Sequence, residues 1–185
     1  LRNLFEIDLE GFELCLNKST PGAEGLITIP FFTGERTPNL PNAKACLLGL
    51  DDQNTGTNNI LRSAVEGVTY GLKYGLGRLA DNSVRAEKII LTGGGAKSDA
   101  WRQIVADICD APVEMHKQEE GAAFGAALQA LAMLEETELT SLVKEHLDRD
   151  STRCCEPDPS TVTFYDEAYF RYRQSVEQIA SIYGN

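Results

Sequence analysis

Basic residues are scarce in this sequence, which has 17 lysines and arginines against 28 acidic residues and a formal net charge of −11. A protein that binds nucleic acid must meet the phosphate backbone with a basic surface, so this charge argues against a nucleic-acid partner. Long hydrophobic runs are missing too, because no stretch approaches the roughly 20 apolar residues that span a bilayer. We therefore expect neither nucleic acid nor a membrane as a partner.

Histidines and closely spaced cysteine pairs are also rare. His116 and His146 are isolated, and the five cysteines show no CxxC spacing, so we expect no metal site. The odd number and scatter of the cysteines indicate reduced thiols and a cytoplasmic protein. The first residues do not form a signal peptide, and Leu1 stands where an initiator methionine would be, as in the middle of a longer protein.

Residues 87–109 carry the most informative pattern in the chain. It predicts a buried strand at 88–91, a turn at Gly93-Gly94-Gly95 and an amphipathic helix from about Ser98. Glycines allow positive φ and leave no Cβ to block a ligand, while the start of the helix points unpaired N–H groups at the turn. An anion or a nucleotide would find donors and space there. The alternative is a tight turn that binds nothing, because short glycine motifs recur by chance.

The rest of the chain alternates between short strands and helices. We expect Gly67, Gly71 and Gly75, which lie on one face of one helix, to mark the close approach of another backbone. The small-residue helix after Glu119-Glu120-Gly121 could lie tight against a sheet or another helix. Further strands are predicted at 25–32 (buried on both faces), 45–50 and 111–116, and further helices within 1–18 and at 57–80 (the longest), 135–150 and 162–183.

The polar loop at 33–42 is predicted to be ordered rather than flexible, because it contains two prolines and a glycine. A loop of this composition beside a buried strand often carries function. Alternatively, Glu35 and Arg36 make local salt bridges that only hold the loop.

Three segments together resemble the C-terminal domain of the FGGY family of carbohydrate kinases. The first runs from Ala45 through a spacer to Glu66, the second is Gly93–Gln103, and the third is Gly121–Ala127. The resemblance implies an α/β fold of the ribonuclease H-like, actin-like ATPase type, with a mixed sheet flanked by helices. Residues 1–185 are then the C-terminal, nucleotide-binding domain, incomplete at its N-terminal edge and without the N-terminal sugar-binding domain.

In such a kinase the substrates are MgATP and a sugar, so the resemblance implies ATP and Mg²⁺ as cofactors and ATP or ADP as partners. The family's glycine segment implies close approach of adenosine at Gly94, Gly95 and Ala96, with Ser98 as a polar contact. In the family this turn contacts adenosine more than phosphate. The family's catalytic aspartate has no counterpart in this chain, so we nominate no catalytic residue.

The loop Phe32–Pro38 resembles that of family members acting on xylulose, and members acting on gluconate carry a related loop. We therefore expect transfer of the γ-phosphoryl group of MgATP to D-xylulose, giving D-xylulose 5-phosphate, by the complete enzyme and not by this fragment alone. A homodimer is left open. The alternatives are another FGGY sugar kinase, a non-enzymatic actin-like protein that binds nucleotide or a partner, and a dinucleotide oxidoreductase. The last lacks GxGxxG spacing, since Lys97 and Ser98 follow where its final glycine should be.

Overall fold

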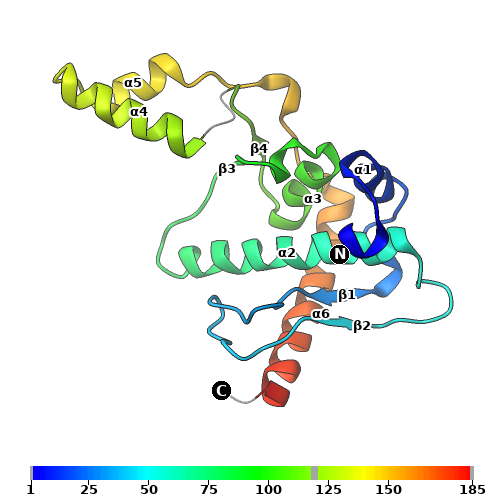
Figure 1. The fold of residues 1–185 in the computed structure, drawn as a ribbon. Helices are drawn as coiled ribbons and strands as arrows, with labels where there is room; N and C mark the ends of the chain where they lie inside the picture. The colour runs from blue at the N-terminus through cyan, green and yellow to red at the C-terminus, as the bar shows by residue number, and fades with distance from the viewer. Residues whose placement is uncertain (1, 118–120, 184–185) are drawn as a thin grey trace.

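A computed structural model describes residues 2–117 and 121–183 of the chain. Within these residues, helices and short strands alternate along the sequence (Figure 1). The helices are α1 (Leu9–Asn17), α2 (Thr57–Ala80), α3 (Asp99–Cys109), α4 (Gly121–Leu134), α5 (Leu139–His146) and α6 (Pro159–Tyr183). The strands are β1 (Ile27–Ile29), β2 (Cys46–Leu48), β3 (Ile89–Ile90) and β4 (Val113–Glu114), with 3₁₀ turns at Arg2–Phe5, Ala23–Gly25, Gly95–Lys97 and Ser151–Arg153.

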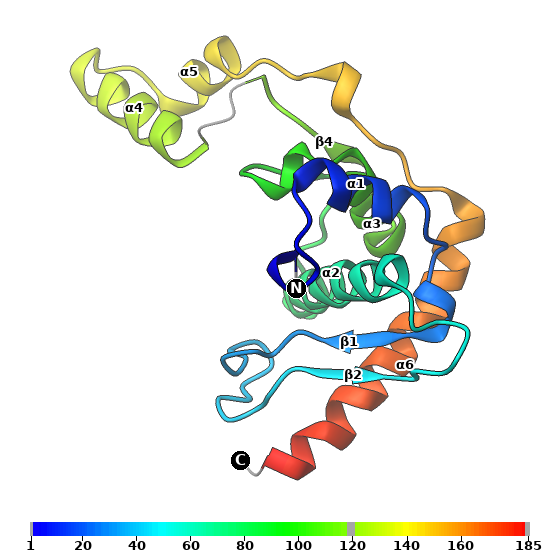
Figure 2. The same cartoon turned by 45° about the vertical axis from the view of Figure 1, so that its right-hand side comes forward.

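Helix α2 runs through the middle of the molecule, with β1 and β2 along one side and α1 and α3 on the other (Figure 1 and Figure 2). Its apolar residues recur at three- and four-residue steps, and its bounds are those that the sequence predicts. Leu61 is fully buried and Tyr70 is 4% exposed, whereas Leu72 and Leu79 further along are 44% and 50% exposed. The buried residues of α2 therefore lie in its part from Leu61 to Tyr70.

The glycines of α2 do not all have the role that their spacing predicts. A Cβ on Gly67 would lie 2.1 Å from the carbonyl oxygen of Thr28, so β1 approaches the helix closely there, as predicted. No described atom lies within 4 Å of a Cβ placed on Gly71 or Gly75, so the prediction of a close backbone is wrong for both. The reason is that β1 ends at Ile29 and its chain passes only the first of the three glycines.

The strands confirm the α/β class but are shorter than the sequence predicts. Those in the described residues form two separate two-stranded sheets instead of one mixed sheet. β1 and β2 pair antiparallel, with Ile27 opposite Leu48, while β3 and β4 pair parallel, with Ile89 opposite Val113.

Burial of the strands also differs from the predictions. In β1, Thr28 and Ile29 are 5% and 0% exposed, while Ile27 is only partly buried. The prediction that residues 88–91 form a buried strand is wrong, because Ile90 is 47% exposed. Among the described strands, only β4 pairs with β3, so β3 lacks a second neighbouring strand.

Helix α6 packs across α2 and α3 and completes the core. It begins at Pro159, earlier than predicted, because proline suits the first turn of a helix. With 25 residues it is longer than α2, which has 24, so the prediction that α2 is the longest helix is wrong. The core cluster between these elements contains Ile29, Phe31, Tyr70, Ile104, Ile108, Tyr165 and Tyr172.

A buried polar cluster joins α6 to α2 inside this core. One carboxylate oxygen of Glu66 accepts hydrogen bonds from Arg62 Nε (2.8 Å), the Tyr165 hydroxyl (2.7 Å) and the Gly22 N–H (2.9 Å). Arg62 also donates to the Tyr165 hydroxyl, at 2.7 Å. Burial raises the pKa of Glu66, and its partners oppose that shift. Each member is satisfied by another, as a buried polar group requires.

Helices α4 and α5 pack on each other and extend away from the rest of the molecule in both views (Figure 1 and Figure 2). The small-residue helix α4 thus lies against a helix, one of the two arrangements that the sequence allows. Leu128 is its one buried residue among those described, and Met133 and Leu134 are 84% and 82% exposed. The predicted helix start at Glu119-Glu120 lies outside the described residues. No helix in the described part of the chain has the length and apolarity of a membrane span.

Candidate functional site

The glycine turn connects β3 to α3, and each of its three glycines has a different environment. Gly93 has φ 88°, a left-handed conformation that glycine adopts without strain. Gly94 is helical in conformation, and no described atom lies within 4 Å of a Cβ placed on it. A Cβ on Gly95 would lie 1.8 Å from Cζ3 of Trp101. The open space that the sequence predicts at this turn is therefore found at Gly93 and Gly94, whereas the indole ring fills the space beside Gly95.

Trp101 is fixed over Gly95 by hydrogen bonds at both ends. Its ring nitrogen donates to the hydroxyl of Thr69 on α2, at 2.9 Å. Its backbone N–H donates to the hydroxyl of Ser98, at 3.0 Å, so Ser98 is the N-cap of α3. The wall of the turn is thereby connected to the central helix.

Glu13 of α1 takes part in the same arrangement, and the sequence analysis did not find it. Its two carboxylate oxygens accept hydrogen bonds from the Ser98 hydroxyl and from the Ala100 N–H, the latter at 2.8 Å. Glu13 is separated from Ser98 by 85 residues, so no local pattern in the sequence could have revealed the contact. The start of α3, where an anion was expected, thus carries a carboxylate of the protein itself.

Ala96 is 1% exposed, so its methyl group faces the interior. Its carbonyl oxygen accepts a hydrogen bond from Arg102 Nη1 at 2.8 Å, and Arg102 also bonds Asp99. Ala96 therefore supports the turn from inside and offers no exposed surface to a ligand. Of the four nominated residues, Gly94 and Gly95 are exposed, Ser98 is partly buried and Ala96 is buried.

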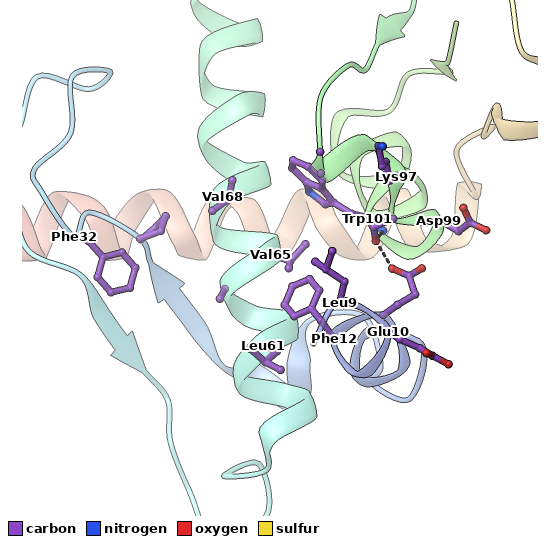
Figure 3. A pocket seen from close by; sticks show the side chains of 16 residues that line it. Leu9, Glu10, Phe12, Phe32, Leu61, Val65, Val68, Lys97, Asp99 and Trp101 are labelled. Atoms are coloured by element: carbon purple, nitrogen blue, oxygen red, sulfur yellow. Dashed lines mark hydrogen bonds between the residues drawn. The ribbon is translucent and has the colours of Figure 1, made fainter. Parts of the chain in front are cut away.

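A cavity of ≈700 Å³ opens beside the turn, between α1 and α2. Figure 3 shows Leu9, Phe12 and Val65 converging on this space, while Asp99 points away from it. A largely apolar cavity of this size, with few polar groups at its rim, suits a planar organic ring better than an ion. Its lining includes Leu9, Phe12, Pro30, Phe32, Leu61, Val65, Val68, Gly94, Gly95, Ser98 and Trp101.

The loop at 33–42 is ordered, as predicted, and it is held by its own backbone. Glu35 and Leu40 exchange two backbone hydrogen bonds of 2.9 Å, and the Glu35 carboxylate accepts from the N–H groups of Arg36 and Thr37. A Cβ on Gly34 would lie 2.2 Å from the Pro41 carbonyl oxygen. Glu35 thus has the local holding role that the sequence analysis kept as an alternative, through backbone N–H groups.

Metal ligation has no support in the geometry of the described residues. They contain no group of three or more histidine, cysteine, aspartate or glutamate side chains placed to hold an ion. All five cysteines are free. The polar side chains that line the cavity are those of Glu10, Glu13, Lys97, Ser98 and Asp99.

Comparison with known proteins gives a consistent family assignment. The model of the FGGY family of carbohydrate kinases, C-terminal domain, matches residues 9–134. Xylulose kinase from Haemophilus influenzae is 39% identical over 179 residues, which are 97% of this chain and 36% of that protein. The chain thus spans about a third of the length of this relative.

Solved structures give the same fold. Ligand-bound xylulose kinase from Lactobacillus acidophilus superposes with a TM-score of 0.88 at 24% identity, covering 97% of this chain and 36% of that one. Gluconate kinase from Lactobacillus acidophilus gives 0.85 at 25% identity, covering 95% and 35%. The solved structures confirm the ribonuclease H-like, actin-like fold, and the family model matches more than half of the chain. This chain therefore belongs to the FGGY family of carbohydrate kinases.

Proposed function

We propose that these 185 residues are the nucleotide-binding part of an ATP-dependent sugar kinase whose substrate is D-xylulose. The observation that carries the proposal is the 39% identity to a xylulose kinase along 97% of the chain. The complete enzyme would transfer the γ-phosphoryl group of MgATP to a hydroxyl of the sugar, with D-xylulose 5-phosphate and ADP as products. Gluconate is the second candidate sugar, because gluconate kinase shares the fold at a TM-score of 0.85.

In this proposal the glycine turn holds the nucleoside part of ATP. Gly94 supplies open backbone, Trp101 forms a rigid wall beside Gly95, and the apolar cavity offers a surface on which a purine ring can pack. Ser98, Glu13 and Lys97 are polar residues that line it. Phosphoryl transfer depends chiefly on positioning and charge neutralisation, so the task of this part is to hold one reactant still.

Mg²⁺ enters this scheme as part of the MgATP substrate. The described residues offer no carboxylate cluster that fits a magnesium ion, so we assign no metal ligand to this part of the chain. We also assign it no general base. The five free cysteines support a cytoplasmic location, where thiols stay reduced. Dimer formation remains a prediction that the described surfaces neither favour nor oppose.

The complete kinase that contains this sequence should form ADP from ATP only when a sugar is added, and D-xylulose should give a higher kcat/KM than D-gluconate. A coupled ADP assay with mass analysis of the product tests this. Higher kcat/KM for gluconate would move the substrate to the second candidate. ATP binding without sugar-dependent ADP formation would favour the non-enzymatic reading instead.

The 185 residues alone should bind ATP but should not phosphorylate D-xylulose, because the relatives are about three times as long and we place their sugar site in the remainder. The purified chain is assayed with both substrates beside the complete kinase. Sugar phosphate formed by the chain alone, free of contaminating kinase, would contradict the proposal that the sugar site lies outside these residues.

A further inference from the structure

The start of α3 is already occupied by a charge from another helix. The N–H groups of Asp99, Ala100 and Trp101 have no carbonyl partner within α3, as at the start of any helix. Ala100 donates to Glu13 at 2.8 Å and Trp101 donates to Ser98 at 3.0 Å. The Ser98 hydroxyl then donates to the second oxygen of Glu13. Two of these three donors are thus engaged in one network that ends in a carboxylate.

This network has an electrostatic consequence for the turn. A carboxylate near the N-terminus of a helix is stabilised by the helix dipole, in the way that a bound phosphate would be. A phosphate brought to the same place would find its donors in use and would meet a like charge. The site beside the turn is therefore suited to an uncharged group.

The network also has a mechanical consequence. Glu13 holds Ser98, Ser98 caps the helix through Trp101, and the Trp101 ring is anchored on Thr69. The ring in turn fills the space beside Gly95, because the three atoms nearest to a Cβ placed there all belong to Trp101. Removing the carboxylate loosens one end of this chain of contacts and leaves the Thr69 end in place.

We propose that Glu13 is a positioning and specificity-determining residue of the nucleotide site. Its carboxylate substitutes for an anion at the start of α3 and reserves the glycine turn for the nucleoside, so the phosphates of ATP lie away from this helix end. The inference rests on the proposed function only where it concerns nucleotide; the filled helix end stands on the hydrogen bonds alone.

The first experiment uses thermal unfolding of the 185-residue chain and two variants, Glu13→Ala and Glu10→Ala. Glu10 stands almost one turn earlier on α1, carries the same charge and is exposed, so it is a matched control for the loss of one charge from this helix. We expect Glu13→Ala to have a lower Tm that sulfate restores more than sodium chloride of equal ionic strength. Wild type and Glu10→Ala should show only the general effect of sulfate on proteins. An equal sulfate response in all three would overturn the proposal.

The second experiment measures adenosine binding through the fluorescence of Trp101, the one tryptophan of the chain. Glu13→Ala should bind adenosine about 10-fold more weakly or worse, since a charged hydrogen bond that positions the wall is lost. Glu167→Ala, which removes an exposed glutamate of α6 outside the cavity, should match wild type. Wild-type binding that Glu13→Ala retains in full would refute the positioning role and leave the proposed function standing. Failure of wild type to bind adenosine would refute the proposed function, and the sulfate experiment would still decide whether Glu13 fills the helix end.

Discussion

At the scale of single residues, two neighbouring glycines of the turn, Gly94 and Gly95, have different roles. Gly95 is needed by the protein itself, because Trp101 occupies the space of its missing side chain. Gly94 has no such demand from any described atom and is conformationally ordinary, with φ −63° and ψ −39°. A glycine that the fold does not require is the better candidate for contact with a ligand.

This difference gives a paired prediction. Gly95→Ala should destabilise the chain by about 1–3 kcal/mol and shift the Trp101 emission, because the new methyl group overlaps the ring. Gly94→Ala should leave the Tm nearly unchanged, since alanine accepts its backbone conformation, but it should weaken ATP binding. Thermal melts, emission spectra and ATP titration on both variants test the pair. Full ATP affinity in a stable Gly94→Ala variant would mean that the turn connects β3 to α3 without binding the nucleotide.

The residue scale also shows what sequence reasoning could and could not reach. The N-cap at Ser98 follows from local chemistry, because serine before an amphipathic run is a strong helix-start signal. The hydrogen bond from the same hydroxyl to the Glu13 carboxylate depends on how α1 packs against α3, and the sequence near either residue does not predict it.

At the scale of elements, the periodicity of apolar residues predicted where the helix α2 begins and ends, but the sequence did not predict which residues contact a neighbouring element. The apolar stripe of α2 gave its bounds to the residue, whereas the shared spacing of its glycines could not say which of them faces a neighbour. The lengths of the strands were overestimated, because a run of apolar residues does not show how many of them pair with a neighbouring strand.

The glycines of α2 should respond to alanine with opposite signs. Gly67→Ala should destabilise the chain by several kcal/mol or prevent folding, because the methyl group collides with the Thr28 carbonyl of β1. Gly71→Ala should stabilise it by about 0.5–1 kcal/mol, since alanine favours a helix and no described atom stands in the way. Urea denaturation of both variants measures the two changes. A Gly71→Ala variant that is as damaged as Gly67→Ala would mean that α2 has a neighbour along its whole length.

The attachment of α6 gives a third prediction. Tyr165→Phe removes a hydrogen bond to Glu66 and another from Arg62 inside the core, so the free energy of unfolding should fall by about 1–3 kcal/mol. Tyr172→Phe is the control, because Tyr172 is 3% exposed in the same cluster and its hydroxyl bonds no described residue. Equal losses in both variants would show that packing, and not the polar cluster, holds α6.

At the scale of the whole molecule, the described residues form a well-packed body and a pair of helices that extends from it with exposed apolar side chains. The body is built on α2 up to Tyr70 together with β1, α3 and α6, while α4 and α5 extend from it with Met133 and Leu134 exposed. The fold class was predictable because three short motifs resemble one family. The arrangement of the site was not, because it depends on side chains that α1, α2 and α3 bring together.

Binding of the ATP nucleoside at the glycine turn is tested directly by titrating the isotopically labelled 185-residue chain with ATP and then with adenosine, followed by backbone amide NMR. We expect saturable shifts of the amide signals of Gly94, Gly95, Ala96 and Ser98 with both ligands. Signals at the turn that stay in place while the chain binds ATP elsewhere, or no binding at all, would contradict it.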